Sequence, residues 1–173
     1  MNLNKLILFL SFCLGCSYNQ SNKHTSADKL GLDTATDTYS VTDEDLSMNL
    51  AIENAKKTIS EFDEALKSNS SAYTDFAVKK RYKTPDGGGE HMWIAGISLV
   101  NGNYQGFVNN NAEKTNEVSY GDTVLVHKRE ISDWMYLDNN VLRGGYTIRE
   151  IRNQMNKEDR NKFDKESGFK IED

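Results

Sequence analysis

The residues from Glu90 to Tyr136 read EHMWIAGISLVNGNYQGFVNNNAEKTNEVSYGDTVLVHKREISDWMY. Short runs rich in β-branched, aromatic and other apolar residues alternate here with turn signals at Asn101-Gly102 and at 120–122. An Asn-Gly pair between two such runs is a strong hairpin signal. This stretch therefore predicts the core of a small, mostly antiparallel β domain, and it contains no recognised reaction motif.

The flanking sequence predicts an α+β domain over residues 72–166. Five strands are expected, at 74–83, 91–100, 104–108, 123–127 and 131–137. They suggest a small antiparallel five-stranded curled sheet or a partly open SH3-like barrel. Two C-terminal helices are expected, the first capped by Thr147 and the second beginning at Asn156 or Lys157, and the tail 167–173 is expected to fray.

A single amphipathic helix is predicted over residues 42–68. Thr42 can cap it, and apolar residues then recur at spacings of three and four, at Ile52, Ala55, Ile59, Phe62 and Leu66. We interpret this stripe as the face that packs on the domain. The alternative is a helix that drives assembly of a structural lipoprotein.

The N-terminus predicts export and lipid anchoring. Residues 1–16 place one charge, Lys5, before a short apolar run that ends in Leu14-Gly15-Cys16. This pattern resembles the lipobox of bacterial lipoproteins, although Cys13 stands where leucine is usual; the alternative is an ordinary cleaved signal peptide. Cys16 is the expected acylation site, followed by a flexible polar tether over 17–41. Because Ser17 rather than aspartate follows Cys16, we expect the outer membrane, facing the periplasm.

Composition excludes several classes of protein. The 173-residue chain has 21 Lys+Arg against 26 Asp+Glu and lacks a basic block, so nucleic acid is not expected as a partner. Its two cysteines, Cys13 and Cys16, both lie in the predicted leader region. A disulfide, a thiolate zinc site and a cysteine nucleophile are therefore excluded from the domain.

Several strings resemble the YegJ-like family of bacterial proteins over about residues 70–155. They are FAVK at 76–79, EHMW at 90–93, GDTV at 121–124, ISDWMY at 131–136 and GGYT at 144–147, with Gly106 and Asn109 between them. The family has no assigned activity to carry over. The resemblance supports the domain assignment and leaves the function open.

The candidate catalytic or metal-binding residues are Glu90, His91, Glu130 and Asp133, with His127 farther away. A carboxylate beside a histidine could orient it as a general base, which would suit an envelope hydrolase or a metal-dependent enzyme. No nucleophile motif or HExxH spacing supports this chemistry. We favour the interpretation in which Glu90 and Asp133 bind turn amides or indole N–H groups and His91 is half exposed. No metal or cofactor is expected.

Candidate binding residues are Trp134, Tyr136 and His91, since an aromatic platform can hold a ligand or a partner. Strand alternation from His91 predicts that Trp93, Ala95, Ile97 and Leu99 share its face, which makes Trp93 a core residue. The basic strip at 79–83 is interpreted as a solvated edge. The sequence favours a non-enzymatic, lipid-anchored module that binds an envelope protein, one version of which is an inhibitor or immunity protein.

Overall fold

The computed structural model of the protein describes residues 35–172, with side chains from residue 46 onward. The predicted signal peptide, Cys16 and the predicted tether as far as residue 34 lie outside this range. The elements are α2 (Ala35–Lys57), α3 (Ile59–Ser68), β1 (Tyr73–Lys83), β2 (Gly89–Val100), β3 (Asn103–Val108), β4 (Thr123–Val126), the 3-10 turn η2 (Lys128–Glu130), β5 (Ile131–Asp138), β6 (Val141–Gly144), α4 (Tyr146–Gln154) and α5 (Lys157–Glu166).

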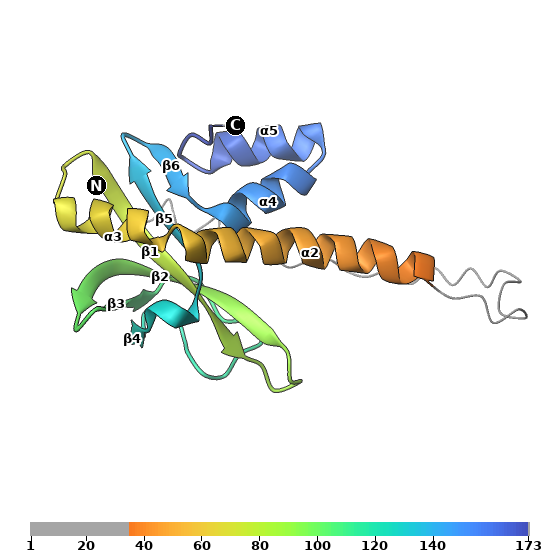
Figure 1. The fold of residues 1–173 in the computed structure, drawn as a ribbon, viewed down its shortest axis with the longest axis horizontal. Helices are drawn as coiled ribbons and strands as arrows, with labels where there is room; N and C mark the ends of the chain where they lie inside the picture. The colour runs from red at the N-terminus through yellow and green to blue at the C-terminus, as the bar shows by residue number, and fades with distance from the viewer. Residues whose placement is uncertain (1–34, 173) are drawn as a thin grey trace, which may run out of the picture.

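The six strands form one antiparallel sheet in the order β4-β3-β2-β1-β5-β6 (Figure 1). The prediction of five strands is wrong because β6, only four residues long, is a strand that pairs with the end of β5. Asn139 and Asn140 form the turn between them with φ of 47° and 67°, the left-handed conformations that a tight hairpin requires.

The predicted α+β class and antiparallel sheet are confirmed, but the sheet is open, so of the two predicted forms, a curled sheet and a partly open SH3-like barrel, the barrel is wrong. β4 and β6 lie at opposite edges and do not pair with each other. The edge of β6 is instead bordered by the C-terminal segment, where the Leu142 amide donates to the Lys170 carbonyl at 2.8 Å. Residues 167–172, for which fraying was expected, are thereby tied to the sheet, and Phe169 is buried against it.

The single helix predicted over 42–68 is in fact two helices. α2 begins at Ala35, inside the predicted tether, and a break at Thr58 separates it from α3. The Thr58 hydroxyl lies 2.8 Å from both the Asn54 carbonyl oxygen and the Tyr146 hydroxyl, so the break is held by side-chain contacts. No helix within residues 35–172 is both long enough and apolar enough to cross a bilayer.

The predicted apolar stripe packs on one face of the sheet. Ala55 and Phe62 are fully buried, and Ile59 and Leu66 pack against the same core. Phe62 lies 5.4 Å from the ring of Tyr104 in an edge-to-face arrangement. α2 and α3 therefore cover this face, which we call the inner face, and the opposite one the outer face (Figure 1).

A bulge in β2 changes the predicted alternation. Gly96 has φ of 64°, and the pairing register with β3 shifts between Ala95 and Ser98. Ile97 consequently packs with Ile94 on the inner face rather than with Trp93. Trp93 is buried on the outer face, as its prediction as a core residue required.

Candidate functional site

Glu90 fixes the loop between β3 and β4. Its carboxylate accepts hydrogen bonds from the backbone amides of Glu113, Lys114 and Thr115 at 2.8, 2.9 and 2.8 Å. Burial raises the pKa of Glu90, but these amides and the charge of Lys114 outweigh it and bring the pKa below its ordinary value of 4.5. The favoured sequence interpretation, a carboxylate bound to turn amides, is confirmed for this residue.

Replacing Glu90 with glutamine is expected to lower the free energy of unfolding at pH 7 by about 1.5–3 kcal/mol, since bonds to a buried charge are lost. Because the folded pKa lies below the unfolded one, Glu90 stabilises the fold above about pH 4.5, and this contribution disappears as the pH falls. Urea unfolding at pH 7 and pH 3 should show the difference shrinking in acid. Glu113→Gln, an exposed change on the same loop, should have an effect below about 0.5 kcal/mol; equal effects of the two would contradict the prediction.

Asp133 caps α4 from a neighbouring strand. It is fully buried, and its carboxylate accepts from the amides of Trp134, Tyr146 and Thr147 at 2.8, 3.1 and 2.8 Å and from the Thr147 hydroxyl at 2.6 Å. Thr147 was predicted to cap this helix, but it lies inside the first turn and the capping position is Gly145, which has no side chain. Burial raises the pKa of Asp133, while the charge of Lys79 and the hydrogen bonds of Thr147 oppose that rise.

The structure does not assemble the predicted catalytic group. His91 is half-buried, and its Nδ1 lies 2.8 Å from the Ser132 hydroxyl rather than against either carboxylate. Glu130 instead pairs with Lys80 at 3.2 Å and accepts from the amide of His127, which is exposed. Among the residues with described side chains, no group of three or more His, Cys, Asp or Glu is placed to hold a metal ion.

The two proposed aromatic binding residues differ in accessibility. Trp134 is 1% exposed and its indole N–H donates to the Ala55 carbonyl at 2.9 Å, so it joins β5 to α2 inside the core. Tyr136 is half-buried and stacks on Phe76 with ring centroids 5.1 Å apart. Neither arrangement offers an aromatic platform that includes Trp134.

A polar hollow of about 520 Å³ lies where β1 runs beyond the start of β5. Both of its carboxylates are occupied: Glu130 pairs with Lys80, and Glu117 accepts from the Lys83 backbone amide at 2.8 Å; Arg81 also lines the hollow. We therefore do not place the main site there.

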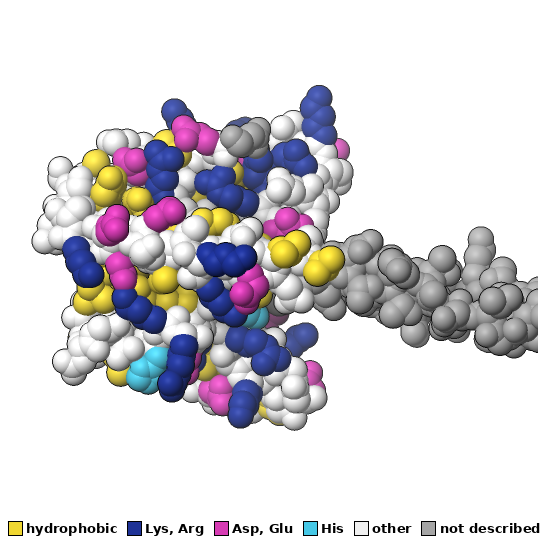
Figure 2. Space-filling model, in the orientation of Figure 1, with side chains coloured by type: hydrophobic (Ala, Val, Ile, Leu, Met, Phe, Trp, Pro, Cys, Tyr) yellow, Lys and Arg dark blue, Asp and Glu magenta, His cyan; other side chains and the backbone are white. Residues whose placement is uncertain are grey.

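A second concavity, which sequence reasoning missed, lies between α2 and α4. We call it the α2–α4 groove. It has a volume of about 250 Å³ and is lined by Ser47, Leu50, Ala51, Asn54, Tyr146, Arg149, Glu150 and Asn153. Leu46 and Leu50, one helical turn apart on α2, are each 55% exposed, and Figure 2 shows hydrophobic side chains at the surface beside the described end of this helix.

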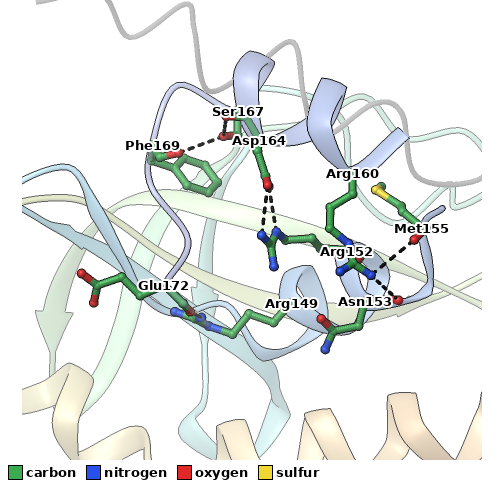
Figure 3. A network of polar contacts seen from close by, with 9 residues as sticks. All are labelled: Arg149, Arg152, Asn153, Met155, Arg160, Asp164, Ser167, Phe169 and Glu172. Atoms are coloured by element: carbon green, nitrogen blue, oxygen red, sulfur yellow. Dashed lines mark hydrogen bonds and ion pairs between the residues drawn. The ribbon is translucent and has the colours of Figure 1, made fainter. Parts of the chain in front are cut away.

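Arginine side chains hold the α4 wall of this groove in place (Figure 3). Arg149 donates to the carbonyls of Gly144, Leu142 and Glu172 at 2.9, 2.8 and 2.7 Å. Arg152 forms a two-point pair with Asp164 of α5, with distances of 2.7 and 3.0 Å. α4 is thus fixed to β6, α5 and the C-terminal segment, which makes the groove a preformed feature.

Comparison with known proteins places the whole described domain in one family. The family described as "Uncharacterized protein conserved in bacteria (DUF2314)" matches residues 45–171. The uncharacterized protein YegJ of Escherichia coli K12 is 35% identical over 102 residues, which cover 59% of this chain and 65% of YegJ. A putative ankyrin repeat protein of Neisseria meningitidis serogroup B is 34% identical over 142 residues, 78% of this chain and 56% of that protein.

The chain therefore spans less than two thirds of the length of either relative. No solved structure matches it. The predicted resemblance to YegJ-like proteins is confirmed, and the match extends beyond 70–155 to include the end of α2 and the C-terminal segment. The chain belongs to the DUF2314 family of uncharacterised proteins conserved in bacteria.

Proposed function

We propose that the protein is a non-enzymatic, lipid-anchored module of the bacterial cell envelope that binds another envelope protein through the α2–α4 groove. The observation that carries this proposal is the exposure of Leu46 and Leu50 on one side of α2, beside a concavity with a fixed wall. Burying the exposed part of each leucine would contribute about 1 kcal/mol to binding.

The surroundings of the leucines resemble a docking surface. Asn54, Glu150 and Asn153 line the same groove as Leu50 and Ala51, so apolar and polar groups lie together there, as in many protein interfaces. A partner helix that presents apolar side chains at a spacing of three or four residues fits such a surface. An inhibitor or immunity protein is one form that this function can take.

The name of one relative supports a role in protein–protein interaction. It is named a putative ankyrin repeat protein, and ankyrin repeats stack into extended concave binding surfaces. By contrast, the carboxylates that a hydrolase would need beside His91 are occupied by backbone amides. The geometry thus favours binding over catalysis.

Anchoring is the second part of the proposal. Acylation of Cys16 would hold the domain at the outer membrane, facing the periplasm, and would raise the local concentration of envelope partners.

Site-specific photo-crosslinking in living cells tests the proposal. We expect a photoreactive amino acid at position 46 or 50 to give one discrete adduct with a different envelope protein, whereas the same group at Leu125, 44% exposed on the edge strand β4, gives none. With the partner identified and purified, Leu50→Ser should weaken direct binding at least tenfold and Leu125→Ser should not, since only the first removes apolar contact area. The Cys16→Ser chain should leave the membrane fraction.

Three results would contradict this function. Adducts of equal yield at positions 50 and 125 would show that the α2–α4 groove is not a specific binding surface. An adduct with a second copy of the chain would favour the alternative in which the helix over 43–67 drives assembly. A Cys16→Ser chain that stays in the membrane fraction would contradict the lipid anchor.

A further inference from the structure

The outer face of β1 and β2 carries a group of cationic and polar side chains that the proposed function does not use. Lys79 and Arg81 are alternate residues of β1, next to Ala77 of the outer core, so both side chains lie on the outer face. Arg81 is directly opposite His91 in the strand pairing, and His91 contacts Ser132 of β5. We call Lys79, Arg81, His91 and Ser132 the outer basic site.

The guanidinium of Arg81 lies against the backbone of β2 at Gly89. A Cβ atom at position 89 would lie 2.0 Å from Arg81 Nε and 2.2 Å from Cζ, so the guanidinium rests directly on the backbone of β2. Gly89 is not among the glycines with positive φ, so the backbone conformation does not itself require glycine there. The absence of a side chain at this position leaves room for the guanidinium to lie against the strand.

The electrostatics of the site favour a negatively charged ligand. Burial, together with the charges of Lys79 and Arg81, lowers the pKa of His91 to about 4, and no carboxylate counteracts them. Asp133 of β5 directs its carboxylate to the start of α4 and offsets part of the charge of Lys79, which contacts the same Thr147 hydroxyl, whereas Arg81 has no such neighbour on β5. Lys79 is itself fixed, with Nζ 3.1 Å from the Thr147 hydroxyl and 5.2 Å from the centre of the Trp93 ring.

We propose that the outer basic site binds an oxyanion, a carboxylate or a phosphate group, over His91. Arg81 supplies the planar fork of N–H donors that matches such a group, and Lys79 supplies a second positive charge. His91 is neutral at pH 7 and donates through Nε2 in the tautomer in which the Ser132 hydroxyl donates to Nδ1. Because position 89 has no Cβ, the guanidinium can lie against β2, on the same face as His91. This site lies on the face of the sheet opposite α2 and shares no residue with the lining of the α2–α4 groove; Lys79 contacts α4 only through Thr147.

The test uses two probes on the purified full chain at pH 7: inorganic phosphate and a capped peptide of glutamates. NMR would follow the side-chain Nε–H signal of Arg81 and the backbone amide of His91. We expect a saturable shift of both signals with at least one probe, and the probe that binds tighter identifies the oxyanion. Sodium chloride at equal ionic strength should produce no saturable shift.

Gly89→Ala is the decisive variant because it keeps every charge and displaces only the guanidinium. We expect it, and Arg81→Gln, to weaken binding of the probe at least tenfold. Arg129→Gln, which removes an exposed arginine elsewhere, should leave binding within twofold. Shifts that rise linearly with both probes, or equal affinity in the native and Gly89→Ala proteins, would overturn the proposal; the spectra themselves report whether each variant is folded.

Discussion

Replacing Asp133 with alanine is expected to lower the free energy of unfolding by about 3–5 kcal/mol. Its carboxylate accepts four hydrogen bonds in a fully buried position, three of them from backbone amides that alanine cannot satisfy. The change also removes the negative charge that faces Lys79 and the only cap of α4, since Gly145 has no side chain. Because α4 forms one wall of the α2–α4 groove, its first turn should loosen as well.

Urea unfolding at pH 7 gives the measurement, as a shift of the midpoint at constant slope. Asn156→Ala is the matched control, because Asn156 caps α5 through the amides of Glu158 and Asp159 at an exposed position. Its loss should be about 1 kcal/mol. Asp133→Asn, which keeps the shape and one acceptor, should fall between the two. A loss for Asp133→Ala no larger than that for Asn156→Ala would show that the buried cap is dispensable.

Local signals in the sequence predict most of the strands. The Asn101-Gly102 turn joins β2 to β3 with φ of 50° and 77°, as the hairpin signal requires. The alternation through β1 also holds, since Phe76 and Val78 pack on the inner face and Ala77 on the outer one. These features depend on neighbours a few residues apart, which is why the sequence alone reveals them.

Features that depend on distant residues could not be predicted in this way. The bulge at Gly96 reverses the facing of Ile97, and a glycine inside a strand pattern signals such a bulge only ambiguously. The cap of α4 comes from Asp133, more than ten residues upstream, while the local pattern pointed to Thr147. The C-terminal segment lies along the free edge of β6, a contact that no local pattern indicates.

The candidate sites illustrate the same limit. Leu46 and Leu50 precede the apolar stripe of α2 at a spacing of four, a signal that could have marked a second apolar patch. Only the fold places α4 beside them and leaves both leucines exposed. Similarly, the interpretation of the basic strip at 79–83 as a solvated edge is wrong, because β1 lies between β2 and β5; the pairing with β2 places the Arg81 guanidinium against Gly89.

Replacing Trp134 with alanine is expected to cost about 3–5 kcal/mol of unfolding free energy, the range for large aromatic residues in cores. Trp134 is 1% exposed, and its ring lies 5.8 Å from the ring of Phe62 in α3 and 5.9 Å from that of Tyr146 in α4. It therefore contacts both of these helices. The indole N–H also satisfies the Ala55 carbonyl. Alanine would leave both a cavity and an unpaired buried acceptor.

The comparison with Tyr136→Ala separates a core role from a binding role at this pair. Tyr136 is half-buried, so its loss should lower the unfolding free energy by only about 1–2 kcal/mol, whereas Trp134→Phe, which keeps a ring, should be milder than Trp134→Ala. Urea midpoints rank the three variants. If Trp134→Ala proved as stable as the native protein, the indole would have to be accessible rather than part of the core. Trp134 would then again be a candidate for direct contact with a partner. If the ranking holds, loss of a partner in a Trp134 variant reports unfolding, and binding must be examined through Leu46 and Leu50, whose exposed side chains can be changed without disturbing the core.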